Sequence, residues 1–412
     1  MKRWLLLVGL LCSLPAAAAD IAIVGARIYP APDSAVIEQG TAILRDGRIA
    51  AVGPRDEVAV PSGAELIDGT GKVLTAGFWN SHVHLMSPAL LQATDLPAAG
   101  LEAELQEMLT RWGFTTVYDI ASFNDAPAAL RARTEAGEVA GPDILYLGTP
   151  FYPLDHMPIY IRELVARLGV PDSNTGTPSE ARARAEAQLA AGADGVKLFA
   201  GSIVGGEIGV MPMDPDIARA AVDAAHRHGK PAFSHPSNMA GLEVSLAAGA
   251  DVLAHTTPFT GPWDGALVDR LCEADVALTP TLTLFEAELR RDGEPEAVVQ
   301  SFLDVAIEQL RAFHAAGGTV LFGTDVGYID QVDTRREFEL MERAGMDWQA
   351  ILASLTTLPA TRFGQGKDKG RIAPGMQADL VLLGSDPAEA VGAFADVELT
   401  IRDGAVLYRQ AN

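Results

Sequence analysis

Two histidines, His82 and His84, stand two positions apart after an apolar stretch, in the segment Gly-Phe-Trp-Asn-Ser-His-Val-His at residues 77–84. Residues two apart on a strand point to the same side, so both imidazoles can face one metal ion. On its own, such a pair is equally well explained as two polar residues that end a strand. The hypothesis of a metal site therefore depends on further ligands elsewhere in the chain.

Four more residues with side chains suited to a metal site lie inside or directly after apolar stretches. Neutral imidazoles and carboxylates are ligands for zinc or a similar divalent ion, with positions left open for water. Half of the chain's eight histidines occupy such positions. The predicted site consists of His82, His84, Lys197, His235, His255 and Asp325. The remaining histidines have simpler explanations, because His226, His228 and His314 lie near the ends of predicted helices, where a cation suits the helix dipole.

Lys197 needs separate treatment, since an ammonium group cannot bind a cation and is costly to bury beside one. It is either a salt-bridge donor to a carboxylate or a chemically converted residue. Burial lowers the pKa of a lysine and frees the amine, which could then take up carbon dioxide and become a carbamate anion. Both interpretations stay open at this stage.

The elements that position these residues are apolar, strand-like segments that alternate with helical patterns, an order typical of parallel βαβ units. Two of the helices are predicted at residues 180–191 and 217–228. Eight such units fit an α/β fold with a (β/α)8 TIM barrel, in which side chains at the carboxyl ends of the strands form the active site. A doubly wound sheet is the alternative. The expected strands are residues 73–78, 115–119, 144–147, 195–199, 231–234, 252–254, 276–279 and 319–322.

The two ends of the chain share a pattern of short strands and hairpin turns. Asp46-Gly47 and Asp403-Gly404 each follow an arginine and separate apolar segments, which is a strong hairpin signal. Neither end is long enough to close a core, so we expect both to pack together as one small β-sandwich. The predicted organisation is a signal peptide at 1–19, the sandwich at 20–72 and 369–412, and the barrel at 73–368.

The first residues have the three parts of a secretory signal: basic residues 1–3, an apolar segment at 4–14, and small residues before Asp20. The segment is too short to cross a membrane, and a buried N-terminal helix is the alternative. We therefore expect a secreted or periplasmic protein. Once Cys12 has left with the signal, Cys272 is alone, which excludes an intramolecular disulfide.

The chain is strongly acidic, with 31 basic and 54 acidic side chains and a formal charge of −23. Such a surface repels nucleic acid and anionic lipid, so neither is an expected partner. The expected partner is a small-molecule amide, and a homo-oligomer stays open.

Several segments together resemble the amidohydrolase superfamily in its binuclear-metal form: His-Val-His at 82–84, a lysine on strand four, single histidines after strands five and six, and Gly-Thr-Asp at 323–325. Residues 357–364 and 370–380 resemble the family's late helix and its return into the β-sandwich. Residues 211–238 look closest to the imidazolonepropionase-like and prolidase-like branch. The resemblance implies that His82, His84 and Asp325 hold one metal ion, that His235 and His255 hold the other, and that Lys197 bridges them as its carbamate.

Two positions depart from the family pattern. Asn80 stands where relatives often have an aspartate, and Ser237 stands where dipeptidase-like relatives often have a tyrosine. Ser237 is therefore one candidate substrate contact. His156, in the loop at residues 151–157, is the other, although an ordinary surface loop explains it equally well.

We predict a hydrolase in which two divalent ions, expected to be Zn²⁺, share a hydroxide that attacks a carbonyl. Asp325 would be the general base and then the general acid. The leading substrate is a carbon–nitrogen amide, as in an N-acyl amino acid or a dipeptide. A cyclic amide, imidazolone or lactone ring is the second candidate, and a catalytically silent metal-binding protein is the third. A serine hydrolase is disfavoured because the chain has no Gly-x-Ser-x-Gly elbow, and Cys272 lies in a helical pattern typical of an inert thiol.

Overall fold

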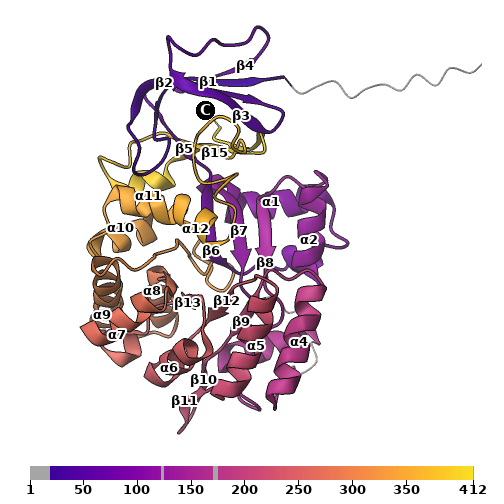
Figure 1. Cartoon of the computed structure of the whole chain (residues 1–412), viewed down its shortest axis with the longest axis vertical. Coiled ribbons are helices and arrows are strands. Elements are labelled where there is room, and N and C mark those ends of the chain that lie inside the picture. The colour runs from indigo at the N-terminus through magenta and orange to yellow at the C-terminus, as the bar shows by residue number, and fades with distance from the viewer. Residues whose placement is uncertain (1–18, 122–124, 170–174, 412) are drawn as a thin grey trace, which may run out of the picture.

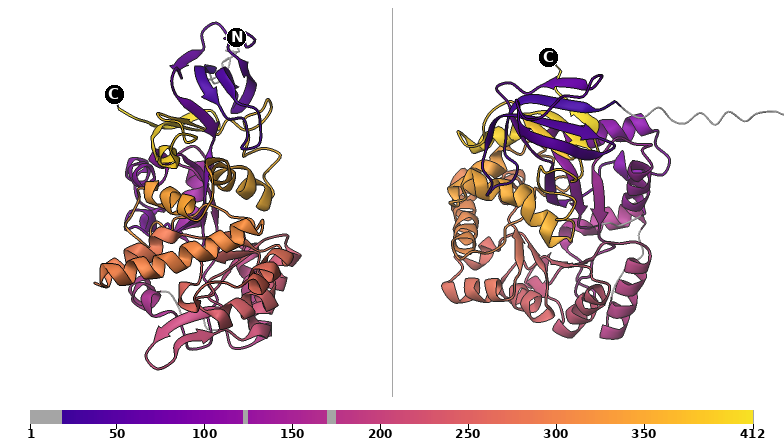
Figure 2. Two further views of the ribbon diagram at one scale, coloured as in Figure 1. Left: turned by 90° about the vertical axis from the view of Figure 1, so that its left-hand side faces the viewer. Right: turned by 45° about the horizontal axis from the view of Figure 1, so that its top comes forward.

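The computed structural model describes residues 19–121, 125–169 and 175–411. Nearly all of the predicted signal segment, residues 1–18, lies outside this range. A barrel with surrounding helices forms the larger part of the molecule, and a sheet built from both ends of the chain lies on one end of it (Figure 1, Figure 2). None of the helices in the described ranges is both long and apolar enough to cross a bilayer.

The barrel consists of parallel strands that follow one another in chain order. One group, β6–β7–β8, and a second, β9–β12–β13–β14, each form a parallel sheet. Phe151 pairs with Leu198 beyond the end of β8, and the segment at 319–326 pairs with β14 through Val320 and with β6 through Val326. These bridges close the ring. The strands are β6 (Phe78–Val83), β7 (Phe114–Asp119), β8 (Asp143–Tyr146), β9 (Val196–Leu198), β12 (Ala232–Ser234), β13 (Val252–Ala254) and β14 (Ala277–Thr279).

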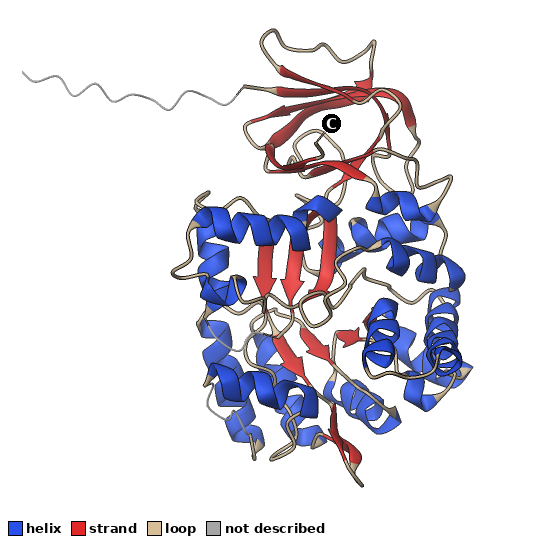
Figure 3. Ribbon diagram, turned by 180° about the vertical axis from the view of Figure 1, so that it is seen from behind, coloured by secondary structure: helices blue, strands red, loops and turns tan. Residues whose placement is uncertain are grey.

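Helices surround these strands, as Figure 3 shows in blue. The two helices predicted from the sequence are α4 and α5, and the side chains of Thr177 and Asp214 cap their first turns. The helices are α1 (Ala98–Met108), α2 (Ala126–Glu135), α3 (Ile159–Leu168), α4 (Pro178–Ala190), α5 (Pro215–Arg227), α6 (Met239–Ala248), α7 (Gly265–Glu273), α8 (Leu282–Arg291), α9 (Glu296–Ala315), α10 (Arg335–Arg343), α11 (Trp348–Leu355) and α12 (Thr357–Arg362). A hairpin of β10 (Gly201–Gly205) and β11 (Gly209–Pro212) follows β9.

Two of the expected barrel strands differ in the structure. The strand expected at 73–78 divides at Gly77: β5 (Val73–Ala76) joins the terminal sheet, and the first barrel strand is β6. A Cβ at Gly77 would lie 2.3 Å from Thr115 Oγ1, so only glycine lets the chain pass here. The strand expected at 319–322 forms only the bridge of Val320, because its backbone hydrogen bonds are divided between β14 and β6.

The terminal sheet combines both ends of the chain, as predicted, in the order β17–β16–β15–β5–β1–β2–β3. Its hydrogen bonds run through these strands as one sheet, and β1 has a left-handed residue at Gly25, where φ is 83°. Before Gly25 β1 pairs with β4, and after it with β5. The strands are β1 (Ile21–Ile28), β2 (Ile37–Arg45), β3 (Arg48–Pro54), β4 (Glu65–Asp68), β15 (Leu380–Leu383), β16 (Val397–Arg402) and β17 (Ala405–Arg409). Their inward side chains share one apolar core.

Candidate metal centre

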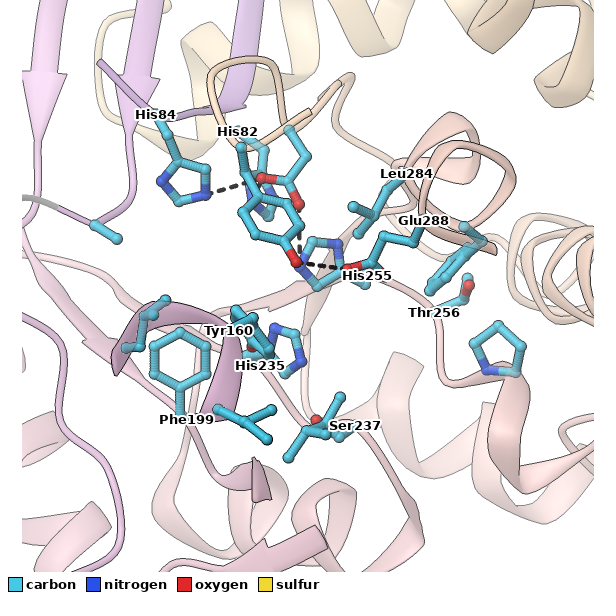
Figure 4. A pocket seen from close by; sticks show the side chains of 18 of the residues that line it. His82, His84, Tyr160, Phe199, His235, Ser237, His255, Thr256, Leu284 and Glu288 are labelled. Atoms are coloured by element: carbon cyan, nitrogen blue, oxygen red, sulfur yellow. Dashed lines mark hydrogen bonds and ion pairs between the residues drawn. The ribbon is translucent and has the colours of Figure 1, made fainter. Parts of the chain in front are cut away.

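The six residues predicted to form the site come together on one side of the barrel. His82 lies near the end of β6, and Lys197 lies within β9. His84, His235 and His255 directly follow β6, β12 and β13, and Asp325 lies between the bridges of Val320 and Val326. All six line one pocket of about 360 Å³. Figure 4 shows the labelled histidines His82, His84, His235 and His255 converging on one region of that pocket. The expected convergence is therefore present in the structure.

Asp325 lies at the centre of this group. Its Oδ1 is 2.8 Å from His84 Nε2 and 3.2 Å from His82 Nε2, and its Oδ2 is 3.6 Å from His255 Nε2. His82, His255 and Asp325 place their ligand atoms within 4.8 Å of one another. This buried group takes residues from both of the ion sites that the resemblance implies.

The unpaired polar atoms of the site fit a metal ion. His82 Nε2, His84 Nδ1 and Asp325 Oδ1 are buried and have no hydrogen-bond partner among the described residues. A buried polar group without a partner costs roughly 1–3 kcal/mol. Of these atoms, His82 Nε2 and Asp325 Oδ1 face one another at 3.2 Å, and an imidazole nitrogen and a carboxylate oxygen so placed are suited to a divalent cation.

Two threonines orient the imidazoles. Thr281 Oγ1 donates a hydrogen bond to the carbonyl of Pro280 and lies 2.6 Å from His255 Nδ1. Because that hydroxyl hydrogen is already used, Nδ1 is the donor and Nε2 keeps its lone pair toward Asp325, the usual arrangement for a metal-binding histidine. Thr279 has a similar but longer contact with His82 Nδ1, at 3.5 Å, and donates to the carbonyl of Leu253.

The backbone at the site adopts the left-handed conformation at several residues other than glycine. The φ angles are 55° at Ser237, 74° at His255, 44° at Thr281 and 62° at Asp325. Such residues are uncommon and cluster at functional sites, where the surrounding structure holds them. Gly327 permits the close packing of this region, because a Cβ there would lie 1.8 Å from the carbonyl oxygen of His84.

Burial sets the protonation states of the site. It lowers the pKa of His82 to about 4 and lowers the pKa values of His235 and His255 well below the usual range. These rings are therefore neutral near pH 7, in the form that binds metals. Burial also lowers the pKa of Lys197 to about 7. Its Nζ lies 5.5 Å from the centre of the Phe199 ring, and within the described residues no carboxylate forms an ion pair with it.

The two predicted substrate contacts differ in position. Ser237 is buried, lines the pocket and donates its hydroxyl to the carbonyl of Gly201 at 2.7 Å. His156 does not line this pocket, and its contact with substrate stays a prediction. The Nδ1 atom of His156 lies 2.6 Å from the carbonyl oxygen of Leu154. The backbone carbonyl of His156 accepts a hydrogen bond from Ser202 Oγ.

Other pocket residues were not predicted from the sequence. Tyr328 donates its hydroxyl to Glu288 Oε1 at 2.6 Å, and burial raises the pKa of that carboxyl. The hydroxyl of Tyr160 is buried without a hydrogen-bond partner among the described residues. Tyr328 could have been suspected, because it stands three residues after Asp325. The helical positions of Glu288 and Tyr160 carry no such signal.

The nucleophiles of the alternative hydrolase classes lie elsewhere. Ser234 Oγ is buried 2.7 Å from Ser245 Oγ, and Cys272 has a pKa raised by burial. Neither residue lines the pocket.

Comparisons with known proteins agree with this architecture. Residues 73–407 match the model of the amidohydrolase family. An ochratoxinase of Aspergillus niger is 22% identical over 79% of this chain and 72% of its own. A dihydroorotase of Mycobacterium tuberculosis is 33% identical over 25% of this chain, and the match spans only 23% of that enzyme's length. The structure of a prolidase candidate from Bifidobacterium longum superimposes with a TM-score of 0.78 and 27% identity, over 95% of each chain.

The family match covers most of the described residues, and the predicted superfamily is thereby confirmed. A buried group of two histidines and an aspartate lies where the barrel strands end. The protein belongs to the amidohydrolase family.

Proposed function

We propose that the protein hydrolyses the amide bond of a linear substrate, an N-acyl amino acid or a dipeptide-like molecule, at a centre with two divalent ions. The observation that carries this proposal is the buried group of His82, His255 and Asp325 beside a mainly apolar pocket. No Ser–His or Cys–His pair accompanies it in the described part of the lining. Hydrolysis there requires an activated water rather than a side-chain nucleophile.

The ligand assignment follows the family pattern. His82, His84 and Asp325 would hold one ion, His235 and His255 would hold the other, and Lys197 would bridge them as a carbamate. The lowered pKa of Lys197 supports this modification, because only the neutral amine reacts with carbon dioxide. Divalent ions such as Zn²⁺, when bound, would polarise the scissile carbonyl and lower the pKa of water from about 15.7 to about 7.

Asp325 would move the proton. Its carboxylate is held between His82 and His84 and reaches the same region as His255. It would take a proton from the attacking water and deliver it to the nitrogen that leaves. The largely buried position of the site excludes competing water and strengthens these interactions.

The test is a set of turnover measurements on chelator-treated protein before and after zinc is restored. We expect hydrolysis of N-acyl amino acids or dipeptides only in the zinc-loaded protein, with two ions per chain. Lys197→Met should lose metal and turnover, whereas Lys230→Met, which removes a lysine paired with Asp194 outside the pocket, should retain both. Full turnover without metal, or faster turnover of cyclic amides or lactones, would overturn the proposal.

A further inference from the structure

Three phenyl rings extend in a row from His255 across the pocket. The centre of the Phe285 ring lies 6.3 Å from that of His255, and Phe302 follows at 5.7 Å. Phe259 is next, 4.7 Å from Phe302. Each neighbouring pair meets edge to face, and all four residues line the pocket. We call Phe259, Phe285 and Phe302 the phenyl row.

The outermost ring is the unusual one, because 69% of Phe259 is exposed. A phenylalanine this exposed gains little stability from its own packing. Exposed apolar side chains beside a pocket are typical of binding surfaces. The position of Phe259 is therefore better explained by contact with a ligand than by folding.

The loop that carries Phe259 is firmly held. Phe259 lies in the 3-10 helix η3 (Pro258–Thr260), next to the fully buried side chain of Gln309. Gln309 accepts from Thr257 N at 2.7 Å and donates to the carbonyls of Thr257 and Gly261, at 2.9 and 2.5 Å. The loop thus fixes an exposed ring in advance, and a binding site built this way loses little entropy when the ligand arrives.

Helix α9 supplies both the anchor and a ring. Phe302 and Gln309 are seven residues apart on this helix, so they lie on the same face about two turns apart. One face of α9 therefore holds the loop in place and contacts the ring that the loop presents. Helix α8 adds Leu284 and Leu289 to the apolar lining beside Phe285, together with the charged side chains of Glu288 and Arg291.

We propose that the phenyl row is the subsite for a large apolar group, aryl or branched alkyl, attached on one side of the scissile amide. The inference rests on the proposed amide hydrolysis and specifies its substrate class. The amide lies at the His255 end of the row, and the apolar group extends toward Phe259. Gln309 is a positioning residue that holds the loop of Phe259.

The test compares kcat/KM for matched amides that differ on one side only. One pair is N-acetyl- and N-(3-phenylpropanoyl)-glycine, and the other is N-acetyl-glycine and N-acetyl-phenylalanine. We expect a preference of about tenfold or more for the ring in one of the pairs, from the burial of a phenyl group. Phe259→Ala should reduce this ratio several-fold. Leu66→Ala, which removes an equally exposed apolar side chain from β4, is the matched control and should leave the ratio unchanged.

Two results would overturn the inference: equal kcat/KM values within both pairs, or an unchanged ratio in Phe259→Ala. If none of the amides is hydrolysed, the proposed function fails. The subsite is then tested separately, by measuring how tightly the protein binds carboxylic acids with and without a phenyl group. Calorimetry with 3-phenylpropanoate and acetate on the zinc-loaded protein should then show tighter binding of the aryl acid, weakened by Phe259→Ala. Equal affinities for the two acids would contradict the subsite as well.

Discussion

Two imidazoles lie against the carboxylate of Asp325, with His84 Nε2 at 2.8 Å and His82 Nε2 at 3.2 Å from its Oδ1. Burial acts to raise the pKa of its carboxyl, but the contacts with His82 and His84 outweigh burial and keep that pKa well below the usual range. The carboxylate is therefore charged at neutral pH, which is the form that a general base needs. Its left-handed backbone, with φ at 62°, turns the side chain toward His82 rather than along the strand direction.

Replacing this residue should separate proton transfer from metal binding. Asp325→Asn keeps an oxygen ligand but removes the base, so we expect kcat to fall about 10²- to 10⁴-fold. The measurements are steady-state kinetics and metal content by elemental analysis. Asp275→Asn is the control, since Asp275 is 82% exposed and pairs only with Arg362. Near-normal turnover of Asp325→Asn with metal bound would show that another group moves the proton.

The six candidate ligands could be located from the sequence because each is tied to a strand end, and a barrel brings strand ends together. The threonines that orient them could not be predicted, because Thr281 reaches His255 through the pairing of β14 with β13, and Thr279 reaches His82 on β6, which is 197 positions away in the sequence. The direction of the His156 side chain could not be predicted for a related reason. It lies in a loop, where hydrogen bonds to Leu154 and Ser202, rather than a regular period, decide its direction.

At the level of elements, helix α8 begins without a cap of its own. Thr281 precedes it with no side-chain hydrogen bond to the first turn. Instead, the buried carboxylate of Glu337, on α10, accepts from Leu282 N, Thr283 N and Thr283 Oγ1, each at 2.8 Å. These donors are the unpaired groups that every helix leaves at its start. Glu337 thus fixes the helix that begins next to Thr281 and carries Phe285 and Glu288 into the pocket.

This anchor should make stability depend on pH. Burial raises the pKa of Glu337 from 4.5 to about 7, outweighing its hydrogen bonds. Since the folded pKa is the higher, the folded state binds more protons between these values. The contribution is complete below about pH 4.5 and is lost as pH rises through about 7, a change of roughly 3 kcal/mol in the free energy of unfolding.

Glu337→Gln should remove that change, as measured by urea unfolding of both proteins from pH 4.5 to 8. The difference between variant and wild type cancels effects that they share, such as the pH dependence of metal binding. Glu339→Gln, at a half-exposed position on the same helix, provides the comparison. If the free energy of unfolding changes with pH in the same way in wild type and Glu337→Gln, the titration of Glu337 is excluded as the cause of that change.

Most of the barrel follows from its alternating pattern, and the helices at 178–190 and 215–227 lie close to where that pattern predicts them. The pattern failed at residues 73–78, where one apolar segment serves two sheets. Only the crowding of Gly77 against Thr115 shows the division. Glu337 caps α8 from a position 55 residues after Leu282, so no local sequence pattern predicts this contact.

Across the whole molecule, one buried lysine connects the terminal sheet to the barrel. Lys369 forms ion pairs with Asp143, at the start of β8, and with Asp379, directly before β15. Its Nζ also donates to Thr116 Oγ1, in β7, at 3.0 Å. The matching hairpins at both termini predicted that the ends pack together, but not this contact. A lysine among the charged residues 367–369 gives no sign that it is buried.

Replacing Lys369 should destabilise the protein, because the buried carboxylate of Asp379 would lose its cation. Asp143 would retain Arg402 at 3.5 Å, but Asp379 Oδ2 is buried and would lose Lys369, which lies 3.1 Å from it. A buried carboxylate without its cation costs roughly 3–5 kcal/mol. Lys369→Met should lower the free energy of unfolding by about that amount in guanidinium titrations. Lys367→Met, two residues away and exposed, should have little effect.

The double variant Lys369→Met/Asp379→Asn distinguishes the stranded charge from lost packing. Asparagine removes the charge and retains an oxygen for the backbone amide of Asp403, which now donates to Asp379 at 2.8 Å. The double variant should therefore recover most of the stability lost in Lys369→Met. If it is as unstable as the single variant, lost packing of the lysine accounts for the effect. If Lys369→Met is as stable as Lys367→Met, the ion pairs contribute nothing to holding the sheet on the barrel.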